Sequence, residues 1–337
     1  MYPRLKLLQK LLADDGVIFI SIDDTECSNL ILICNEIFGA SNFVANVSWQ
    51  RTYSPRNDSK GIVSEVEHLV VFSKNPGWQP NKLPRTEAMD SRYKNPDNDV
   101  APWKSSDAFA PGAATHQGMV YAIQHPFTGE MLYPSNGRCW RYQQSSMLEY
   151  MQGWCNYRLE NLHDEKERAR VCGIDESAVR KDVLAIVLEE PLEVSAAKAQ
   201  KVYNRGRWPG FYFTKGGYGG IARKTYLENV GGRLPTNLWM YEETGHTDEA
   251  KKELISLFGG RSPFDTPKPT RLLDFVLKVA GTSETLMLDS FAGSGTTAHA
   301  VLNANKADNG NRHFILIEMM DYADSITAER VKRVIKG

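Results

Sequence analysis

The stretch LDSFAGSGTTAHAV, residues 288–301, constrains the fold of this chain more than any other. It is an apolar run that ends in Asp289, followed by Gly293, Gly295 and a segment with helical patterning. Glycine adopts positive φ and lets the backbone approach a ligand closely. The first N–H groups of a helix have no partner within that helix. The stretch therefore predicts a strand, a glycine turn and a helix N-terminus that together hold a nucleotide.

The surroundings of this loop support a binding role. GSGTTA at 293–298 fits the permissive dinucleotide pattern G-x-G-x-x-[G/A]. An isolated G-x-G is as often a turn that only needs flexible glycines. Here an apolar strand precedes the loop, and the next predicted strand, HFILIE, ends in Glu318. Folds of this kind bind the ribose hydroxyls with an acid at the end of the second strand.

The position and charge of the loop indicate which nucleotide it takes. A single helix is predicted after Glu318, so a dinucleotide fold would need its remaining strands from upstream. This disfavours NAD and a nicotinamide-dependent oxidoreductase. Asp289, directly before the loop, would repel phosphates and attract a sulfonium–amino-acid group. With the aromatic Phe291 inside the loop, the pattern favours S-adenosylmethionine.

The sequence predicts alternating helices and strands at both ends of the chain and a different residue composition between them. Residues 1–75 and 263–337 carry the alternation, and 76–262 are rich in proline, aromatic and glycine residues, with a charged helical stretch at about 158–205. In the first flank we predict helices at 3–12 and 25–39 and strands at 17–23, 42–49 and 67–74. In the second we predict helices at 270–280, 295–305 and 322–334 and strands at 285–290 and 313–318. Neither flank is long enough for a full sheet domain, so we predict an α/β fold whose sheet uses both flanks, with an inserted domain between them.

Composition limits the class of protein. The chain has no apolar run of about eighteen residues and no secretion leader, which disfavours membrane spanning and export. Its five cysteines contain no C-x-x-C pair, so we expect reduced thiols in a cytoplasmic protein. Their spacing with the histidines fits no common zinc module, and no metal site is predicted. A net charge of −1 leaves room for a local basic cleft.

Several motifs together resemble β-class amino-methyltransferases that act on DNA, most closely the modification subunit of type III restriction–modification systems. The cofactor end of that family is similar to SPFDTPKPTRLLDFVLKVA, DSFAGSGTTAHAV and HFILIEMMDYA. MYPRLKLLQKLLADDGVIFISIDDTE and EVEHLVVFSKN resemble the motifs that follow its catalytic tetrapeptide. In this family the catalytic motif comes first, the target-recognition insertion second and the cofactor half last. That order accounts for the late glycine loop.

The resemblance implies a Rossmann-like, S-adenosylmethionine-dependent methyltransferase fold and methylation of adenine N6 in double-stranded DNA. It also implies a homodimer and a helicase–nuclease restriction subunit as partner. Carried over residue by residue, it assigns the cofactor site, with Glu318 on the ribose and a Lys-Pro pair on the methionine side: Asp289, Phe291, Gly293, Gly295, Thr296, Glu318, Lys268 and Pro269. Taken singly, Lys268-Pro269 is also compatible with a plain helix start and Glu318 with a solvated strand end.

The chain departs from the family at the catalytic motif. These enzymes use a D-P-P-Y type tetrapeptide, and the 337 residues contain no Pro-Pro dipeptide, so no catalytic residue is predicted. The family places the tetrapeptide upstream of MYPRLKLL. We therefore expect a truncated or internally started reading frame, or a fragment, that is inactive by itself. A non-catalytic DNA-recognition or specificity remnant is the alternative.

Cations in two regions are candidates for DNA contacts, because phosphates require them. The loop at 51–61 carries Arg51, Arg56 and Lys60, and the glycine-aromatic stretch at 205–224 supplies Arg205, Arg207, Lys215, Arg223 and Lys224. The alternative is that they are solvated surface charges. The neighbouring aromatic residues are more typical of a core than of a base-stacking platform: Trp208, Phe211, Tyr212 and Phe213.

Overall fold

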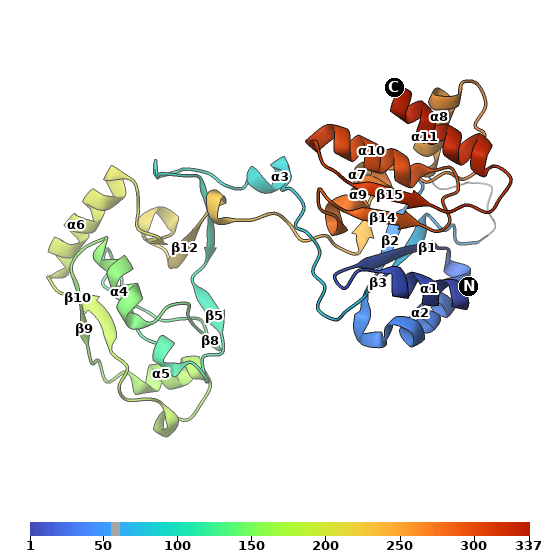
Figure 1. Cartoon of the computed structure of the whole chain (residues 1–337). Coiled ribbons are helices and arrows are strands. Elements are labelled where there is room, and N and C mark those ends of the chain that lie inside the picture. The colour runs from blue at the N-terminus through green and yellow to red at the C-terminus, as the bar shows by residue number, and fades with distance from the viewer. Residues whose placement is uncertain (55–60) are drawn as a thin grey trace. The chain divides into compact units, whose positions relative to one another are not determined.

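The chain divides into two compact units in the computed structural model, which describes residues 1–54 and 61–337. Unit 1 combines Met1–Pro84 with Gly232–Gly337, and unit 2 is Arg85–Gly231. Figure 1 shows the blue N-terminal and red C-terminal segments in the same unit. These boundaries differ from those expected at 75/76 and 262/263, because the segment 232–262 belongs to unit 1.

Hydrogen bonds and packing hold that segment to unit 1. The Trp49 indole N–H donates to the carbonyl of Gly245 at 3.1 Å. The helix α8 (Thr247–Phe258) accepts two bonds from the Arg333 guanidinium, at its Leu257 and Phe258 carbonyls, at 3.0 and 3.1 Å. The proline- and glycine-containing sequence around this segment gave no periodicity that would have placed it with the flanks.

The N-terminal flank of unit 1 forms most of one sheet and covers one of its faces. Its elements are α1 (Tyr2–Leu11), β1 (Val17–Ile22), α2 (Asp24–Phe38), the short 3-10 helix Ala40–Asn42, β2 (Phe43–Gln50) and β3 (Val66–Ser73). The strand order is β1-β3-β2-β13, with β13 (Leu238–Trp239) parallel to β2 and the other pairs antiparallel. α1 and α2 bury Leu5, Leu30 and Phe38 against this sheet.

The C-terminal flank carries the glycine loop. Its elements are α7 (Tyr241–Thr244), α8, α9 (Thr270–Ala280), β14 (Leu286–Asp289), α10 (Thr296–Asp308), β15 (His313–Leu316), a π-helical turn (Ala323–Ala328) and α11 (Glu329–Lys336). β14 and β15 pair in parallel across the α10 crossover. α9 buries Leu272, Phe275 and Val276 in a cluster that Phe19 of β1 and Met287 of β14 also contact.

The predicted α/β fold class is confirmed, and the strand pairing corrects one detail. Both flanks share a core around α9, as expected, and β13 extends the N-terminal sheet. Within the described residues, however, β14 and β15 form a two-stranded sheet of their own. Apolar periodicity predicts that a strand exists but carries no information about its partner.

Unit 2 is built from three small sheets and four helices among the described residues. Its strands are β4 (Trp103–Asp107), β5 (Phe109–Pro111), β6 (Ile123–Gln124), β7 (Met131–Leu132), β8 (Arg138–Trp140), β9 (Tyr157–Glu160), β10 (Ala185–Leu188), β11 (Phe211–Phe213) and β12 (Ile221–Tyr226). Its helices are α3 (Glu87–Asp90), α4 (Gln144–Gln152), α5 (Glu165–Cys172) and α6 (Leu192–Arg205), with 3-10 helices at Gln117–Met119, Glu176–Ala178, Lys215–Gly217 and Leu227–Asn229. The sheets are β7-β6-β10-β9, β11-β12-β4 and β5-β8.

The stretch expected to be helical at about 158–205 contains β9 before α5 and β10 between α5 and α6, which corrects that prediction. β10 is a run of four fully buried residues between charged segments, too short to register as a strand pattern. All five cysteines are buried free thiols, in line with the predicted reduced state. Over the ranges 1–54 and 61–337, no helix is both long and apolar enough to cross a bilayer.

Candidate functional site

The glycine loop connects β14 to α10 through backbone that only glycine adopts easily. Gly293 has φ 51° and Gly295, directly before α10, has φ 77°. A Cβ on Gly295 would lie 3.0 Å from the carbonyl oxygen of Thr327, and one on Gly293 would lie 3.4 Å from the ring of Phe264. The glycines therefore serve both the turn and the close packing of the loop against the π-helical turn. The N–H groups of the first turn of α10 point out of its N-terminus, as in any helix.

Asp289 stabilises this loop by accepting two hydrogen bonds. Its Oδ1 accepts the backbone N–H of Phe291 at 3.1 Å, and its Oδ2 accepts the hydroxyl of Thr297 at 2.5 Å. A carboxylate offers about four acceptor positions, so capacity for a ligand is left. The Phe291 ring is 53% exposed, and the Arg4 guanidinium lies 5.0 Å from its centroid. Arg4 of α1 thus contacts the loop from the other flank of unit 1.

Glu318, two residues after β15, holds the other side of the loop through hydrogen bonds. Its Oε2 accepts the N–H of Gly293 at 2.8 Å, and its Oε1 accepts the N–H groups of Met319 and Met320 at 2.8 and 3.1 Å. Burial acts to raise the pKa of Glu318, but the bonds from Met320, Gly293 and Met319 outweigh it and hold the pKa below its usual value. The group is therefore an anion at neutral pH, and backbone donors fill three of its roughly four acceptor positions.

Lys268 and Pro269 lie beside the loop at the start of α9. Pro269 directly precedes the helix, and the Lys268 carbonyl accepts the hydroxyl of Thr296 at 3.1 Å. The Lys268 ammonium pairs with the Glu67 carboxylate of β3 and lies 5.3 Å from the centroid of the Trp49 ring. The segments that carry the eight predicted cofactor-site residues therefore contact one another. The Lys268-Pro269 segment bonds to Thr296, and the loop before Thr296 bonds to Glu318.

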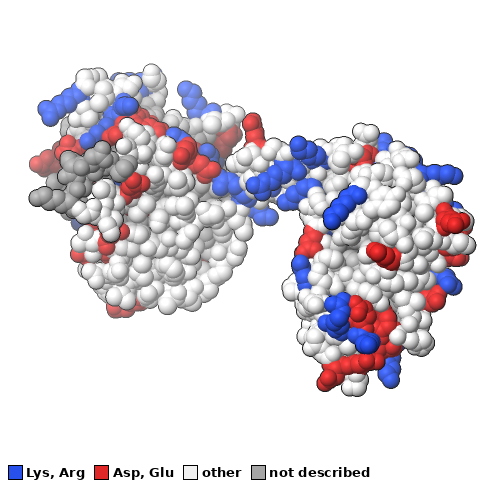
Figure 2. Space-filling view, turned by 180° about the vertical axis from the view of Figure 1, so that it is seen from behind, with Lys and Arg blue, Asp and Glu red and all other residues white. Residues whose placement is uncertain are grey.

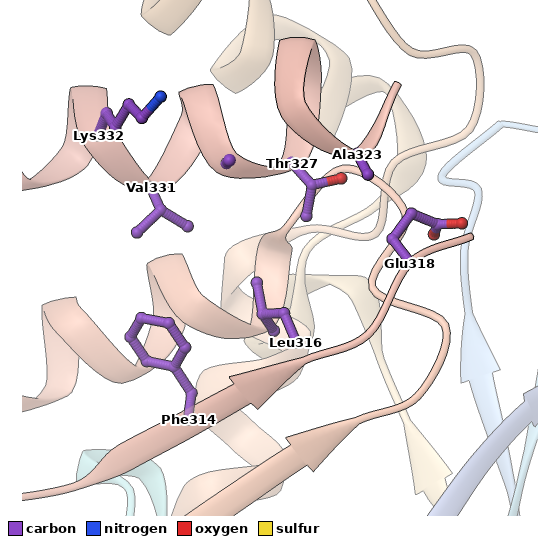
Figure 3. A pocket seen from close by; sticks show the side chains of 8 residues that line it. Phe314, Leu316, Glu318, Ala323, Thr327, Val331 and Lys332 are labelled. Carbon is purple, nitrogen blue, oxygen red and sulfur yellow. The ribbon is translucent and has the colours of Figure 1, made fainter. Parts of the chain in front are cut away.

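A cavity of about 490 Å³ borders this loop. Phe314 and Leu316 of β15 line one side, and residues of the π-helical turn and α11 line the other: Ala323, Thr327, Ala328, Val331 and Lys332. Figure 3 shows Glu318 at one end of this set of side chains and Lys332 at the other. The hydroxyl of Thr327 donates to the carbonyl of Gly293 at 2.6 Å, so the cavity and the glycine loop share a wall.

The candidate DNA contacts fall in both units and differ in exposure. Arg51 follows β2 in unit 1 and is exposed, whereas Arg56 and Lys60 lie outside the described residues. Arg205, Arg207 and Lys215 are exposed in unit 2. Figure 2 shows basic and acidic side chains distributed over the visible face of each unit.

Two of the basic residues predicted at 205–224 as DNA contacts are less exposed than such a contact requires. The Lys224 side chain is fully buried, with its ammonium 2.5 Å from both Asp97 and Asp99, so it is not a phosphate contact. Arg223 on β12 is only partly exposed. The aromatic residues Phe211, Tyr212 and Phe213 are buried in the core of unit 2, which agrees with the packing interpretation. Trp208 is partly buried and stacks on Tyr203, with ring centroids 4.7 Å apart.

The sequence gave no signal for several residues that shape the site. Arg4, Glu67, Thr327 and Arg330 contact the predicted residues. Arg4 and Glu67 lie in motifs that carried no assigned role for them, and Thr327 and Arg330 lie in none of the motifs. Arg330 is 0% exposed although it lies on α11, a helix rich in charged residues, so only its helical phase relative to Thr327 could have indicated that it faces inward.

Comparison with known proteins gives consistent matches. Residues 1–329 match a family model described as DNA methylase. The type III restriction-modification enzyme StyLTI Mod subunit of Salmonella typhimurium (strain LT2) is 31% identical over 99% of this chain and 44% of that protein. The EcoPI Mod subunit of Escherichia phage P1 is 28% identical over 94% of this chain and 44% of its own length. The type II methyltransferase M.KpnI of Klebsiella pneumoniae is 27% identical over 94% of this chain and 66% of its length. The chain therefore spans less than half the length of the two Mod subunits.

Proposed function

The chain belongs to the DNA methylase family, and on that premise we propose that it binds S-adenosylmethionine at the glycine loop and takes part in methylation of adenine N6 in DNA. Methyltransferases of this family generally use S-adenosylmethionine. The observation that carries the proposal for this chain is the pair of carboxylates, Asp289 and Glu318, that hold the loop from both sides. We assign the ribose hydroxyls to Glu318 and the cationic amino-acid end to the side of Asp289.

The charge of the site favours a cation over a pyrophosphate. A phosphate about 4 Å from one carboxylate would be repelled by about 4 kcal/mol at an effective dielectric constant of about 20, and a sulfonium would be attracted by a similar amount. Lys268, the nearby ammonium, is already paired with Glu67. Arg4 contacts the loop at the Phe291 ring, so the preference for a sulfonium over a pyrophosphate rests on the two carboxylates, Asp289 and Glu318.

The apolar cavity beside Glu318 supports the placement of an adenine. Its volume of about 490 Å³ lies within the range of small-ligand sites, and Phe314, Leu316 and Val331 supply apolar walls. In the proposed arrangement the ribose reaches Glu318 at the mouth of the cavity and replaces the side-chain hydrogen bond that Tyr322 makes to this carboxylate. Glu318 would keep its bond to Gly293, so the loop would not have to open.

We propose unit 2 as the target-recognition part, in place of the span 76–262 expected from the sequence. Its exposed Arg205, Arg207 and Lys215 are proposed phosphate contacts, together with Arg51 of unit 1. The names of the relatives extend the proposal to a Mod subunit of a type III restriction-modification enzyme. From the family resemblance we further propose double-stranded DNA as its target, a homodimer, and a helicase–nuclease restriction subunit as its partner.

The residues that would act on the target amine are not among these 337, which contain no D-P-P-Y type motif. Bound S-adenosylmethionine would supply a methyl group for direct attack by the exocyclic amine, and the protein would contribute orientation. The residues identified here bind and orient; none accepts the amine proton. A non-catalytic DNA-recognition component remains the second candidate, and the missing motif is the observation that favours it.

Titration calorimetry of the 337-residue chain with S-adenosylmethionine and with NAD tests the cofactor assignment. We expect binding of S-adenosylmethionine, no binding of NAD, and at least tenfold weaker binding by Glu318→Gln, because a charge-assisted bond to the ribose would be lost. Binding of NAD alone would overturn the assignment. Transfer of a labelled methyl group to duplex DNA by this chain would contradict the proposed absence of a catalytic group.

A further inference from the structure

We propose that Arg330 is a positioning residue that holds the Lys268-Pro269 segment and the glycine loop in place relative to each other. We further propose that protonation of the adjoining His299 weakens cofactor binding. This inference rests on the proposed cofactor site. Arg330 touches neither the cavity nor the loop surface, so it acts through the residues it holds.

Arg330 donates hydrogen bonds to every segment that surrounds it. Its side chain is completely buried, and its Nη1 donates to the hydroxyls of Ser294 at 3.0 Å and Thr296 at 2.9 Å. Its Nη2 donates to Oε2 of Glu253 at 2.9 Å and to the hydroxyl of Thr270 at 3.2 Å. A single planar guanidinium thus satisfies groups on α8, α9, α10 and the glycine loop.

A guanidinium can only donate hydrogen bonds, so the hydroxyls around Arg330 accept from it. The Thr296 hydroxyl donates its own proton to the Lys268 carbonyl. The Thr270 hydroxyl donates to Glu253, so it too accepts from Arg330. Arg330 is therefore the donor on which these hydroxyls depend, and Glu253 is the final acceptor.

The cluster joins the two halves of the proposed site. Thr270 lies directly after Lys268-Pro269, and Ser294 and Thr296 stand on either side of Gly295. Arg330 bonds to both the Lys-Pro segment and the glycine loop, and so reinforces the direct bond from the Thr296 hydroxyl to the Lys268 carbonyl. A lysine in its place would present a compact ammonium instead of a planar fork and could not reproduce this set of bonds.

His299 makes the cluster sensitive to pH. Its Nδ1 lies 3.1 Å from Nη2 of Arg330 and 3.7 Å from Oε1 of Glu253, the two charged groups that face it from α11 and α8. Burial lowers the pKa of His299; Glu253 opposes this shift and Arg330 adds to it. The neutral ring accepts from Arg330 through Nδ1, whereas the protonated ring loses that lone pair and adds a second cation.

The sign of the pH effect follows. The pKa of His299 is below the ordinary histidine value of about 6.5, so the intact cluster is present above that value and is lost as pH falls through the lowered pKa. Affinity for S-adenosylmethionine should therefore decrease on acidification.

The test is the dissociation constant of S-adenosylmethionine, measured by calorimetry at pH 7.5 and 5.5. At pH 7.5 we expect Arg330→Lys to bind at least tenfold more weakly than the unaltered chain. Ser294→Ala, which removes a single hydrogen bond and leaves the buried charge pair intact, should bind about fivefold more weakly. Arg333→Lys is the matched control, because Arg333 lies on the same helix but contacts Glu329 and the end of α8. It should bind as the unaltered chain does.

The unaltered chain should bind more weakly at pH 5.5 than at pH 7.5, and His299→Asn, which offers an oxygen near the position of Nδ1 but does not titrate, should lose this pH dependence. Unchanged affinity in Ser294→Ala, or an equal pH dependence in His299→Asn, would overturn the inference while leaving the proposed cofactor intact. No binding by the unaltered chain at either pH would overturn the proposed function and the inference with it.

Discussion

Replacing Gly295 by alanine tests whether the glycine loop is built by close packing as well as by its turn. Gly295 has φ 77°, and its substituted Cβ would meet the Thr327 carbonyl oxygen at 3.0 Å. Gly173, at the end of α5, provides a matched control, because it has the same left-handed conformation (φ 66°, ψ 38°, against φ 77°, ψ 27° at Gly295) and no heavy atom within 4 Å of the added carbon. Both variants carry the same backbone strain, so their difference isolates the steric contact.

The expected magnitudes follow from these two terms. Alanine in the left-handed region costs about 1–2 kcal/mol. Overpacking against backbone that cannot move costs about 1–3 kcal/mol more. The Thr327 backbone is fixed because its side chain is bonded to the Gly293 carbonyl, so little relaxation is available. We expect Gly295→Ala to lower the free energy of unfolding by about 2–5 kcal/mol, and Gly173→Ala by about 1–2 kcal/mol.

Urea denaturation of the two variants beside the unaltered chain measures both values. Gly295→Ala should also weaken S-adenosylmethionine binding, whereas Gly173→Ala should not. Equal destabilisation by the two substitutions would refute the argument, because it would mean that only φ matters and that the loop does not pack against Thr327.

Three further predictions concern unit 2 and the DNA contacts. Lys224→Met should destabilise the chain by about 3–5 kcal/mol in urea, because it leaves Asp97 and Asp99 buried beside no cation; a loss under 1 kcal/mol would contradict the ion-pair account. Burial acts to raise the pKa of Asp99, but bonds from Lys224 and its neighbours hold it below the ordinary value, so its contribution to stability is present above about pH 4 and lost as pH falls through the lowered pKa. Acid titration of the unfolding free energy should show that loss, and Asp99→Asn should remove it. Arg51→Glu should weaken duplex DNA binding and reduce the slope of log affinity against log salt by about one; an unchanged slope would place Arg51 outside the interface.

Local elements of unit 1 were predictable because each has its own sequence signal. The strand at 17–22 is an unbroken apolar run, and α2 begins where Asp23 accepts the N–H of Thr25 and ends at Gly39, as capping preferences require. The glycine loop was predictable for the same reason, since positive φ restricts the residue type. These signals are short-range, so they do not depend on how far apart the two flanks lie in the sequence.

Long-range relations were not predictable in this way. No pattern along 232–262 indicates that it packs with the flanks, and none distinguishes a shared sheet from the separate β14–β15 pair. The burial of Lys224 depends on two aspartates more than a hundred residues away. Arg330 was missed because an arginine on a helix rich in charged residues looks exposed until its partners in the loop are known.

The central claim is that S-adenosylmethionine binds between Asp289 and Glu318. Hydrogen–deuterium exchange of the chain with and without S-adenosylmethionine tests it most directly, because a ligand bound to Asp289 and Glu318 would slow the exchange of the backbone N–H groups that these carboxylates hold. We predict slower exchange in peptides that cover residues 289–299 and 316–322, with no change in unit 2. Unchanged exchange in both peptides, or protection confined to unit 2, would contradict the account.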